Sequence, residues 1–142
     1  MQAQVAGFLF DKDCLNVALI LKNRPDYLAD KWNGIGGKVM DGETVHDAMR
    51  REFREEAGLD VLGWRRFAIH QTKNNTEISW FVAQVERSKL AEVESMTDEP
   101  VEIFCTGILP PNIVHNLHFL IPMAIDYLLC RSPGYEIVER TV

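Results

Sequence analysis

Residues 37–59 read GKVMDGETVHDAMRREFREEAGL, a glycine-containing loop that leads into a segment rich in acids. Thr44 is a suitable N-cap, because its side-chain oxygen can accept a hydrogen bond from a backbone N–H of the first helical turn. Gly58 suits the left-handed residue that commonly follows a helix end. We therefore expect a helix over residues 45–57.

Three glutamates, Glu52, Glu55 and Glu56, lie on overlapping parts of this helix surface, because residues three and four apart are neighbours. At 3.6 residues per turn, Glu52 and Glu56 fall in the middle of the apolar stripe that includes Met49 and Phe53. Carboxylates on a core-facing stripe need neutralisation. A hard divalent cation, Mg²⁺ or Mn²⁺, suits these oxygen ligands.

A solvated helix face is the alternative, with the glutamates paired to neighbours such as Arg51. The preceding loop argues against it, because four glycines within nine positions indicate sharp turns and a close approach of the backbone to another group. These glycines are Gly34, Gly36, Gly37 and Gly42. Neither the Walker nor the dinucleotide-binding spacing is present.

Residues 37–59 resemble the signature of the Nudix hydrolases: Gly, five residues, Glu, seven residues, Arg-Glu, an apolar residue, any residue, Glu-Glu, any residue, Gly, an apolar residue. Every specified position is filled, by Gly37, Glu43, Arg51, Glu52, Phe53, Glu55, Glu56, Gly58 and Leu59. The resemblance implies hydrolysis of a nucleoside diphosphate linked to a further group, by attack of water on phosphorus with a divalent metal.

The resemblance also implies roles for residues. Glu52, Glu55 and Glu56 would bind Mg²⁺ (or Mn²⁺) together with the carbonyl of Gly37, and Glu52 or Glu55 would instead orient or deprotonate the attacking water. Family members differ in this base, so both remain candidates.

Other residues would support this centre. Glu43 and Arg51 would form an ion pair that holds the loop on the helix. A further catalytic carboxylate often comes from a later loop in this family, and Glu99 is the first candidate here, with Glu102 second. A solvated loop acid is the alternative for Glu99.

The loop over residues 32–38 resembles that of the oxidised-purine nucleoside triphosphatases of this family, in which an Asn at the position of Asn33 hydrogen-bonds the purine. The segment over residues 110–116 lacks the acidic pair with which some of those enzymes read the base, and Asn112 or Asn116 are the candidate replacements. A turn or capping role for Asn112 is equally open. Phosphate contacts are expected from Lys22, Arg24 and Lys38.

Three functions compete. The first is a Mg²⁺-dependent pyrophosphohydrolase that converts a nucleoside triphosphate, oxidised or not, to the monophosphate and pyrophosphate. The second applies the same chemistry to a nucleoside diphosphate linked to a sugar, as in ADP-ribose, or to a dinucleotide or mRNA cap. The third is a non-catalytic nucleotide sensor, which the complete acidic set argues against.

Composition narrows the class of protein. A chain of 142 residues with 46% hydrophobic content suits one domain over residues 1–142, and the net charge of −6 argues against a nucleic-acid polymer as partner. We expect a cytoplasmic protein without signal peptide or membrane helix, whose Cys14, Cys105 and Cys130 are reduced thiols. Nothing in the sequence specifies an oligomeric state.

The expected elements are strands at 3–10, 16–22, 64–72, 77–86 and 101–105, a loop over 23–36, the acidic helix, and a helix over 112–130 that Pro122 kinks or breaks. This order suits an α/β (α+β) fold. The Nudix resemblance implies an α/β/α sandwich with a mixed sheet between helices.

Overall fold

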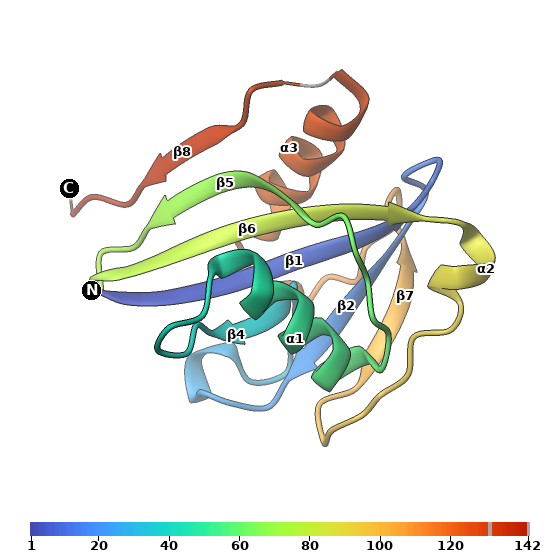
Figure 1. Ribbon diagram of the computed structural model, residues 1–142, viewed down its shortest axis with the longest axis horizontal. Coiled ribbons are helices and arrows are strands. Elements are labelled where there is room, and N and C mark those ends of the chain that lie inside the picture. Colours follow the sequence, from blue (N-terminus) through green and yellow to red (C-terminus); the bar gives the residue numbers. More distant parts are fainter. Residues whose placement is uncertain (131, 142) are drawn as a thin grey trace.

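The computed structural model describes residues 1–130 and 132–141, with the side chain of Cys130 left out. Figure 1 shows a long twisted sheet with helices packed on it. The strands are β1 (Gln2–Asp11), β2 (Asn16–Lys22), β3 (Lys31–Asn33), β4 (Ile35–Lys38), β5 (Arg65–Gln71), β6 (Thr76–Val85), β7 (Val101–Cys105) and β8 (Tyr135–Val138). The helices are the 3₁₀ turn η1 (Asp26–Leu28), α1 (Val45–Ala57), the short α2 (Arg87–Leu90) and α3 (Leu117–Cys130).

The sheet is mixed. Its strand order is β3-β2-β1-β6-β5-β8, with β4 also paired to β1 and β7 to β2. The pairs β1–β6 and β5–β8 are parallel and the others antiparallel. Strand β1 meets β4 along its first half and β2 along its second half, so β4 is held beside the start of β1.

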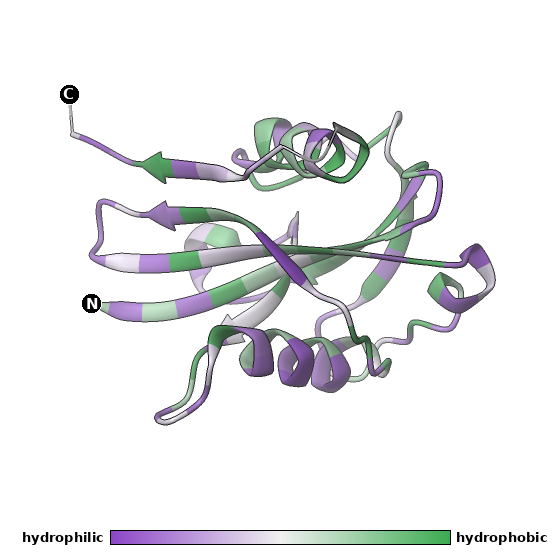
Figure 2. Ribbon diagram, turned by 45° about the horizontal axis from the view of Figure 1, so that its top comes forward, coloured by the Kyte–Doolittle hydropathy of each residue, from purple (hydrophilic) through white to green (hydrophobic). Residues whose placement is uncertain are grey.

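Each face of the sheet is covered by one long helix, which confirms the expected α/β/α sandwich. Alternate residues of β1 point to opposite faces, so Phe8 and Phe10 pack with α3, whereas Val5 and Leu9 pack with α1. Figure 2 shows α3 and α1 on opposite sides of the sheet, with hydrophilic residues along the outer side of α1.

The structure corrects three expectations about the elements. The segment 23–36 is not one loop, because it contains η1, β3 and the start of β4, which are ordered by pairing with β2 and β1. The second long helix begins at Leu117 rather than residue 112, since the backbone near Ile113 instead pairs with Trp32 as a bridge. Strand β8 was not predicted, and α3 continues through Pro122 without a break.

Two of the three cysteines can be compared with the expectation. Cys14 is buried and Cys105 is exposed, and both are free thiols, whereas the prediction for Cys130 lies outside the described side chains. Among the described residues, none of the helices has the length and apolar content needed to cross a membrane.

Candidate active site

Helix α1 has the ends that the sequence predicts. The Thr44 side chain accepts a hydrogen bond from the Asp47 N–H at 3.1 Å, and Gly58 adopts a left-handed conformation with φ 74°. Its buried side consists of Ala48, Met49, Phe53 and Ala57. Glu52 and Glu56 are half-buried beside this apolar surface, while Glu55 is exposed.

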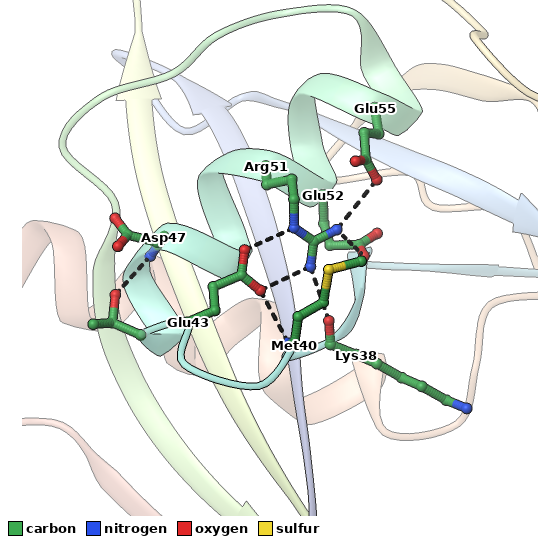
Figure 3. A network of polar contacts seen from close by, with 8 residues as sticks. Lys38, Met40, Glu43, Asp47, Arg51, Glu52 and Glu55 are labelled. Carbon is green, nitrogen blue, oxygen red and sulfur yellow. Dashed lines mark hydrogen bonds and ion pairs between the residues drawn. The ribbon is translucent and has the colours of Figure 1, made fainter.

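The Arg51 side chain forms hydrogen bonds with three glutamates, one from the loop after β4 and two from α1 (Figure 3). Its guanidinium donates to both carboxylate oxygens of Glu43 at 2.7 and 2.9 Å, to Glu52 at 2.8 Å, to Glu55 at 3.2 Å and to the Lys38 carbonyl at 3.0 Å. All five N–H groups of the arginine therefore have acceptors. The expected Glu43–Arg51 ion pair is present, and it joins the loop after β4 to α1.

The Arg51 guanidinium lowers the pKa of Glu43 to about 2, because the hydrogen bonds stabilise the ionised carboxylate. The same contact raises the pKa of Arg51. Both side chains are about 15% exposed, so solvent screens this pair less than a surface ion pair.

Gly37 of β4 lies directly against Glu52. A Cβ atom placed on Gly37 would be 2.6 Å from the carboxylate carbon of Glu52, so any side chain here would occupy the space of that carboxylate. The neighbouring Gly36 faces the opposite way, and a Cβ there would collide with the backbone of Val5 and Ala6 in β1. The glycines thus allow β4 to lie flat between β1 and α1.

Glu56 is the acid on α1 whose ionised form is disfavoured by its surroundings. Burial raises its pKa, and the carboxylates of Glu52 and Glu99 raise it further, although Lys22 and a hydrogen bond from Thr97 act in the opposite direction. The Thr97 hydroxyl lies 3.3 Å from the Glu56 carboxylate. A region of the protein that disfavours a third negative charge is one that a cation would stabilise.

Glu99 is buried and is held by two groups from the end of β2. Lys22 donates to one of its carboxylate oxygens at 2.9 Å, and the Asn23 backbone N–H donates to the other at 2.7 Å. Burial alone would raise the pKa of Glu99, but these hydrogen bonds outweigh it and the pKa is lowered. Glu99 is therefore no solvated loop acid. Glu102, the second candidate, lies exposed on β7.

The donor set fits a hard divalent cation. It consists of oxygens only, from the carboxylates on α1 and the backbone of β4, and a cation there would offset the environment that disfavours the ionised form of Glu56. Among residues 1–130 and 132–141, however, no three His, Cys, Asp or Glu side chains already converge as metal ligands. Glu52 and Glu55 both pair with Arg51, at 2.8 and 3.2 Å.

A cleft of about 830 Å³ is lined in part by Ala6, Ile78 and Trp80, which belong to the apolar cluster on the α3 side of the sheet. It brings together residues from β2, β3, β4 and the loop before α3, including all five that the sequence suggested for substrate contacts: Lys22, Arg24, Asn33, Lys38 and Asn116. Gly37 also lines it, so the cleft reaches the acidic centre.

The suggested contacts differ in how they are held. The side-chain Oδ1 of Asn33 accepts a hydrogen bond from the Gly34 backbone N–H at 2.8 Å, which fixes the side-chain amide at the wall of the cleft. Arg24 is exposed and paired with Asp98 at 2.7 Å. The Lys38 side chain extends away from Arg51 (Figure 3).

Asn112, the alternative to Asn116, does not line the cleft. Its side-chain amide donates to the carbonyl of Asp30 at 2.8 Å, and its own carbonyl accepts from the Trp32 N–H at 2.9 Å. Asn112 therefore joins the segment before α3 to β3, which is the structural role left open for it.

Sequence reasoning missed several residues of the cleft. These include the exposed Tyr27 and Lys31 and the buried His70. The signal for His70 was a polar residue on the core-facing side of a strand, since alternation places it on the same face as the buried Ala68. Polar residues at such positions usually have a specific partner.

Comparison with known proteins agrees with this architecture. The NUDIX domain model matches residues 2–117. The oxidized purine nucleoside triphosphate hydrolase of Mus musculus is 51% identical over 45 residues, which is 32% of this chain and 28% of that protein. The chain thus matches less than a third of the length of this curated relative.

Two solved structures share the fold. A MutT NUDIX hydrolase from Burkholderia pseudomallei superposes with a TM-score of 0.72 at 18% identity, covering 86% of this chain and 96% of that one. An ADP-ribose pyrophosphatase from Streptococcus suis gives a TM-score of 0.70 at 18% identity, covering 97% of this chain and 98% of that one. At 18% identity, both likenesses show the shared fold alone.

Proposed function

Because this chain belongs to the Nudix family of pyrophosphohydrolases, we propose that it hydrolyses a nucleoside triphosphate, with an oxidised purine as the preferred base, to the monophosphate and pyrophosphate. The observation that carries the proposal is the continuity of the cleft with the acids of α1, since Gly37 lines the cleft and contacts Glu52. The local similarity to an oxidized purine nucleoside triphosphate hydrolase supports the choice of base.

In this proposal, Glu52, Glu55 and Glu56 hold Mg²⁺ (or Mn²⁺) with the carbonyl of Gly37. The bound cation supplies charge neutralisation at the phosphate oxygens and lowers the pKa of bound water. Phosphoryl transfer of this kind asks little covalent chemistry of the protein, so its residues act mainly by position and charge.

The remaining residues of the centre have supporting roles. Glu52 or Glu55 would orient the attacking water or take its proton instead of binding the ion, and Glu99 is a third candidate for this role. Lys22 and Lys38, with Arg24 at the rim, bind the phosphates. Arg51 and Glu43 keep the loop after β4 on α1, so that Gly37 stays against Glu52.

Asn33 and Asn116 complete the proposal at the base end of the cleft. A primary amide offers both a donor and an acceptor, so each can pair with the edge of a purine. These two side chains come from β3 and from the segment just before α3.

Turnover of a nucleotide panel tests the function. Purified protein with Mg²⁺ is given dGTP, 8-oxo-dGTP, ADP-ribose and a dinucleotide, and the products are separated by chromatography. Release of pyrophosphate and 8-oxo-dGMP, with 8-oxo-dGTP as the best substrate, is expected. If ADP-ribose is cleaved faster than 8-oxo-dGTP, the proposed substrate is wrong. If nucleotides bind without turnover, the protein is a nucleotide sensor and not an enzyme.

Two variants make the result specific. Glu56→Gln removes one proposed ligand and should lower kcat by orders of magnitude. Glu136→Gln changes an exposed acid of β8 that does not line the cleft, and it should leave kcat unchanged. Hydrolysis in ¹⁸O-labelled water shows whether water attacks the α or the β phosphorus, because the label enters only the product that contains the attacked atom.

A further inference from the structure

His70, in β5, is a buried polar residue to which the proposed chemistry assigns no role. The residue is 1% exposed, yet it lines the cleft. The Trp80 indole N–H donates to its Nδ1 atom at 3.3 Å. Since an indole nitrogen can only donate, Nδ1 carries no proton, and the neutral imidazole has its proton on Nε2.

The Nε2 atom lacks a hydrogen-bond partner among the described residues. Two other buried side-chain atoms share this condition, Trp64 Nε1 and Ser132 Oγ, but neither residue lines the cleft. A buried donor without an acceptor destabilises a protein by about 1–3 kcal/mol, so such groups are rare and commonly wait for a ligand or water.

Glu139 provides an acceptor on the same side of the imidazole. It follows β8, its backbone N–H donates to the Gln71 carbonyl at 3.0 Å, and its side chain also lines the cleft. Its carboxylate oxygen is 3.3 Å from His70 Nε2, but the contact lacks the direction of a hydrogen bond. Nε2 itself is buried, so a ligand reaches this N–H donor only when the partly exposed Glu139 side chain turns aside, which leaves the carboxylate acceptor beside it.

We infer that His70 and Glu139 read a lactam edge of the base, meaning a ring carbonyl next to a ring N–H. The carbonyl would accept from His70 Nε2, and the ring N–H would donate to the Glu139 carboxylate. Guanine and hypoxanthine have such an edge at C6 and N1, and an 8-oxopurine has one at C8 and N7. The inference rests on the proposed function, since it assumes that the cleft binds a nucleotide.

Adenine has the opposite pattern at its C6 edge, with an amino donor next to a ring nitrogen acceptor. Its amino group would meet the His70 donor and its ring nitrogen would meet the Glu139 carboxylate. Both contacts would be repulsive. The pair should therefore exclude unoxidised adenine nucleotides, and oxidation at C8 should make an adenine nucleotide acceptable by creating a lactam edge.

Equilibrium binding of nucleoside monophosphates tests the pair without turnover or metal. The probes are dAMP, dIMP and 8-oxo-dAMP, which differ only at the two edges in question. Wild-type protein should bind dIMP or 8-oxo-dAMP at least about tenfold more tightly than dAMP, the factor that one well-placed hydrogen bond to a charged group supplies. The preferred probe identifies which edge is read.

Glu139→Gln is the main variant, because Glu139 is on the rim and its loss should not unfold the protein. It should reduce the preference to about twofold or less, since an amide can donate as well as accept. His70→Phe should do the same, with the added effect that Trp80 loses its acceptor. Glu136→Gln, on the exposed side of β8, should keep the wild-type preference.

Equal binding of the three monophosphates, no binding of any of them, or a preference that survives Glu139→Gln would overturn the inference. In the last case His70 and Glu139 only join β5 to the segment after β8, and the variant should lower the unfolding temperature alone. The matched triphosphates separate the two proposals. Turnover without base preference contradicts only the lactam pair, whereas base preference without turnover contradicts only the proposed hydrolysis.

Discussion

Arg51 shows how much of the site depends on one residue. Its five N–H donors join the loop after β4, Glu43 and two of the α1 acids. A lysine has a single ammonium group on a flexible chain and could not reproduce this set of planar contacts. The positively charged guanidinium of Arg51 therefore holds Glu52 and Glu55 in place and neutralises part of their charge.

Glu56→Gln should separate activity from stability. Burial, with Glu52 and Glu99 nearby, raises the pKa of Glu56, so its ionised form at neutral pH opposes folding. The neutral amide removes this penalty, and the metal-free variant should be at least as stable as wild type in urea at pH 7, while kcat falls by orders of magnitude. Loss of stability together with unchanged turnover would contradict both parts.

Glu43→Gln should destabilise the protein in a pH-dependent way. The folded pKa is about 2, below the ordinary value of 4.5, so the ion pair stabilises above about pH 4.5 and loses its effect as the pH falls toward 2. We expect a loss of about 1–2 kcal/mol at pH 7, measured by urea unfolding.

The difference between Glu43→Gln and wild type should shrink steadily below pH 4.5. Asp60→Asn is the matched control. Its partner is Arg50, both side chains are 45% exposed, and solvent screens such a surface pair so that its removal should have little effect on stability. An equal loss in the two variants would mean that partial burial of the Glu43–Arg51 pair contributes little.

At the scale of elements, β4 is the short strand that lies between the cleft and helix α1. It has only four residues, and two of them are glycines that face opposite ways. One faces the backbone of β1 and the other the carboxylate of Glu52. The two positions therefore have different tolerance for a side chain.

Gly37→Ala and Gly36→Ala should have opposite profiles. At Gly37 the added methyl meets the end of a flexible side chain, so Glu52 moves, stability changes by less than about 1 kcal/mol, and kcat falls at least about tenfold. At Gly36 the methyl meets backbone, so the strand must shift and the protein loses several kcal/mol, with about 2–4 expected. Thermal unfolding and steady-state kinetics on both variants check this contrast.

At the scale of the molecule, the sheet separates two tasks. The α1 side carries the acids of that helix, whereas the α3 side carries Trp80 and its partner His70, which line the cleft. The two sides meet where β4 lies beside the first half of β1. A nucleotide whose base lies in the cleft can thus reach the acids with its phosphates.

Mg²⁺ should stabilise the whole protein through this meeting point. A ligand present at ten times its Kd stabilises the folded state by about 1.4 kcal/mol, which raises the Tm of a chain of this size by a few degrees. The shift should be seen with Mn²⁺ as well, should disappear in Glu56→Gln, and should persist in Glu136→Gln. An equal shift in Glu56→Gln would show that the ion binds elsewhere.

The sequence alone determined the ends of α1, the cluster of acids on it, the five core strands and the Nudix resemblance. These features depend on residues close together in the chain, where caps and the 3.6-residue period act directly. The short strands β3, β4 and β8 were missed because they form only by pairing with distant partners.

Only the tertiary structure decided which residues meet. It pairs Lys22 with Glu99 across 77 positions, assigns Asn112 to a structural contact, and brings His70 and Glu139 together through the parallel pairing of β5 and β8. The physical reason is that sheet register sets these contacts. A shift of one residue along a strand would move every side chain to the other face, and no local pattern specifies that choice.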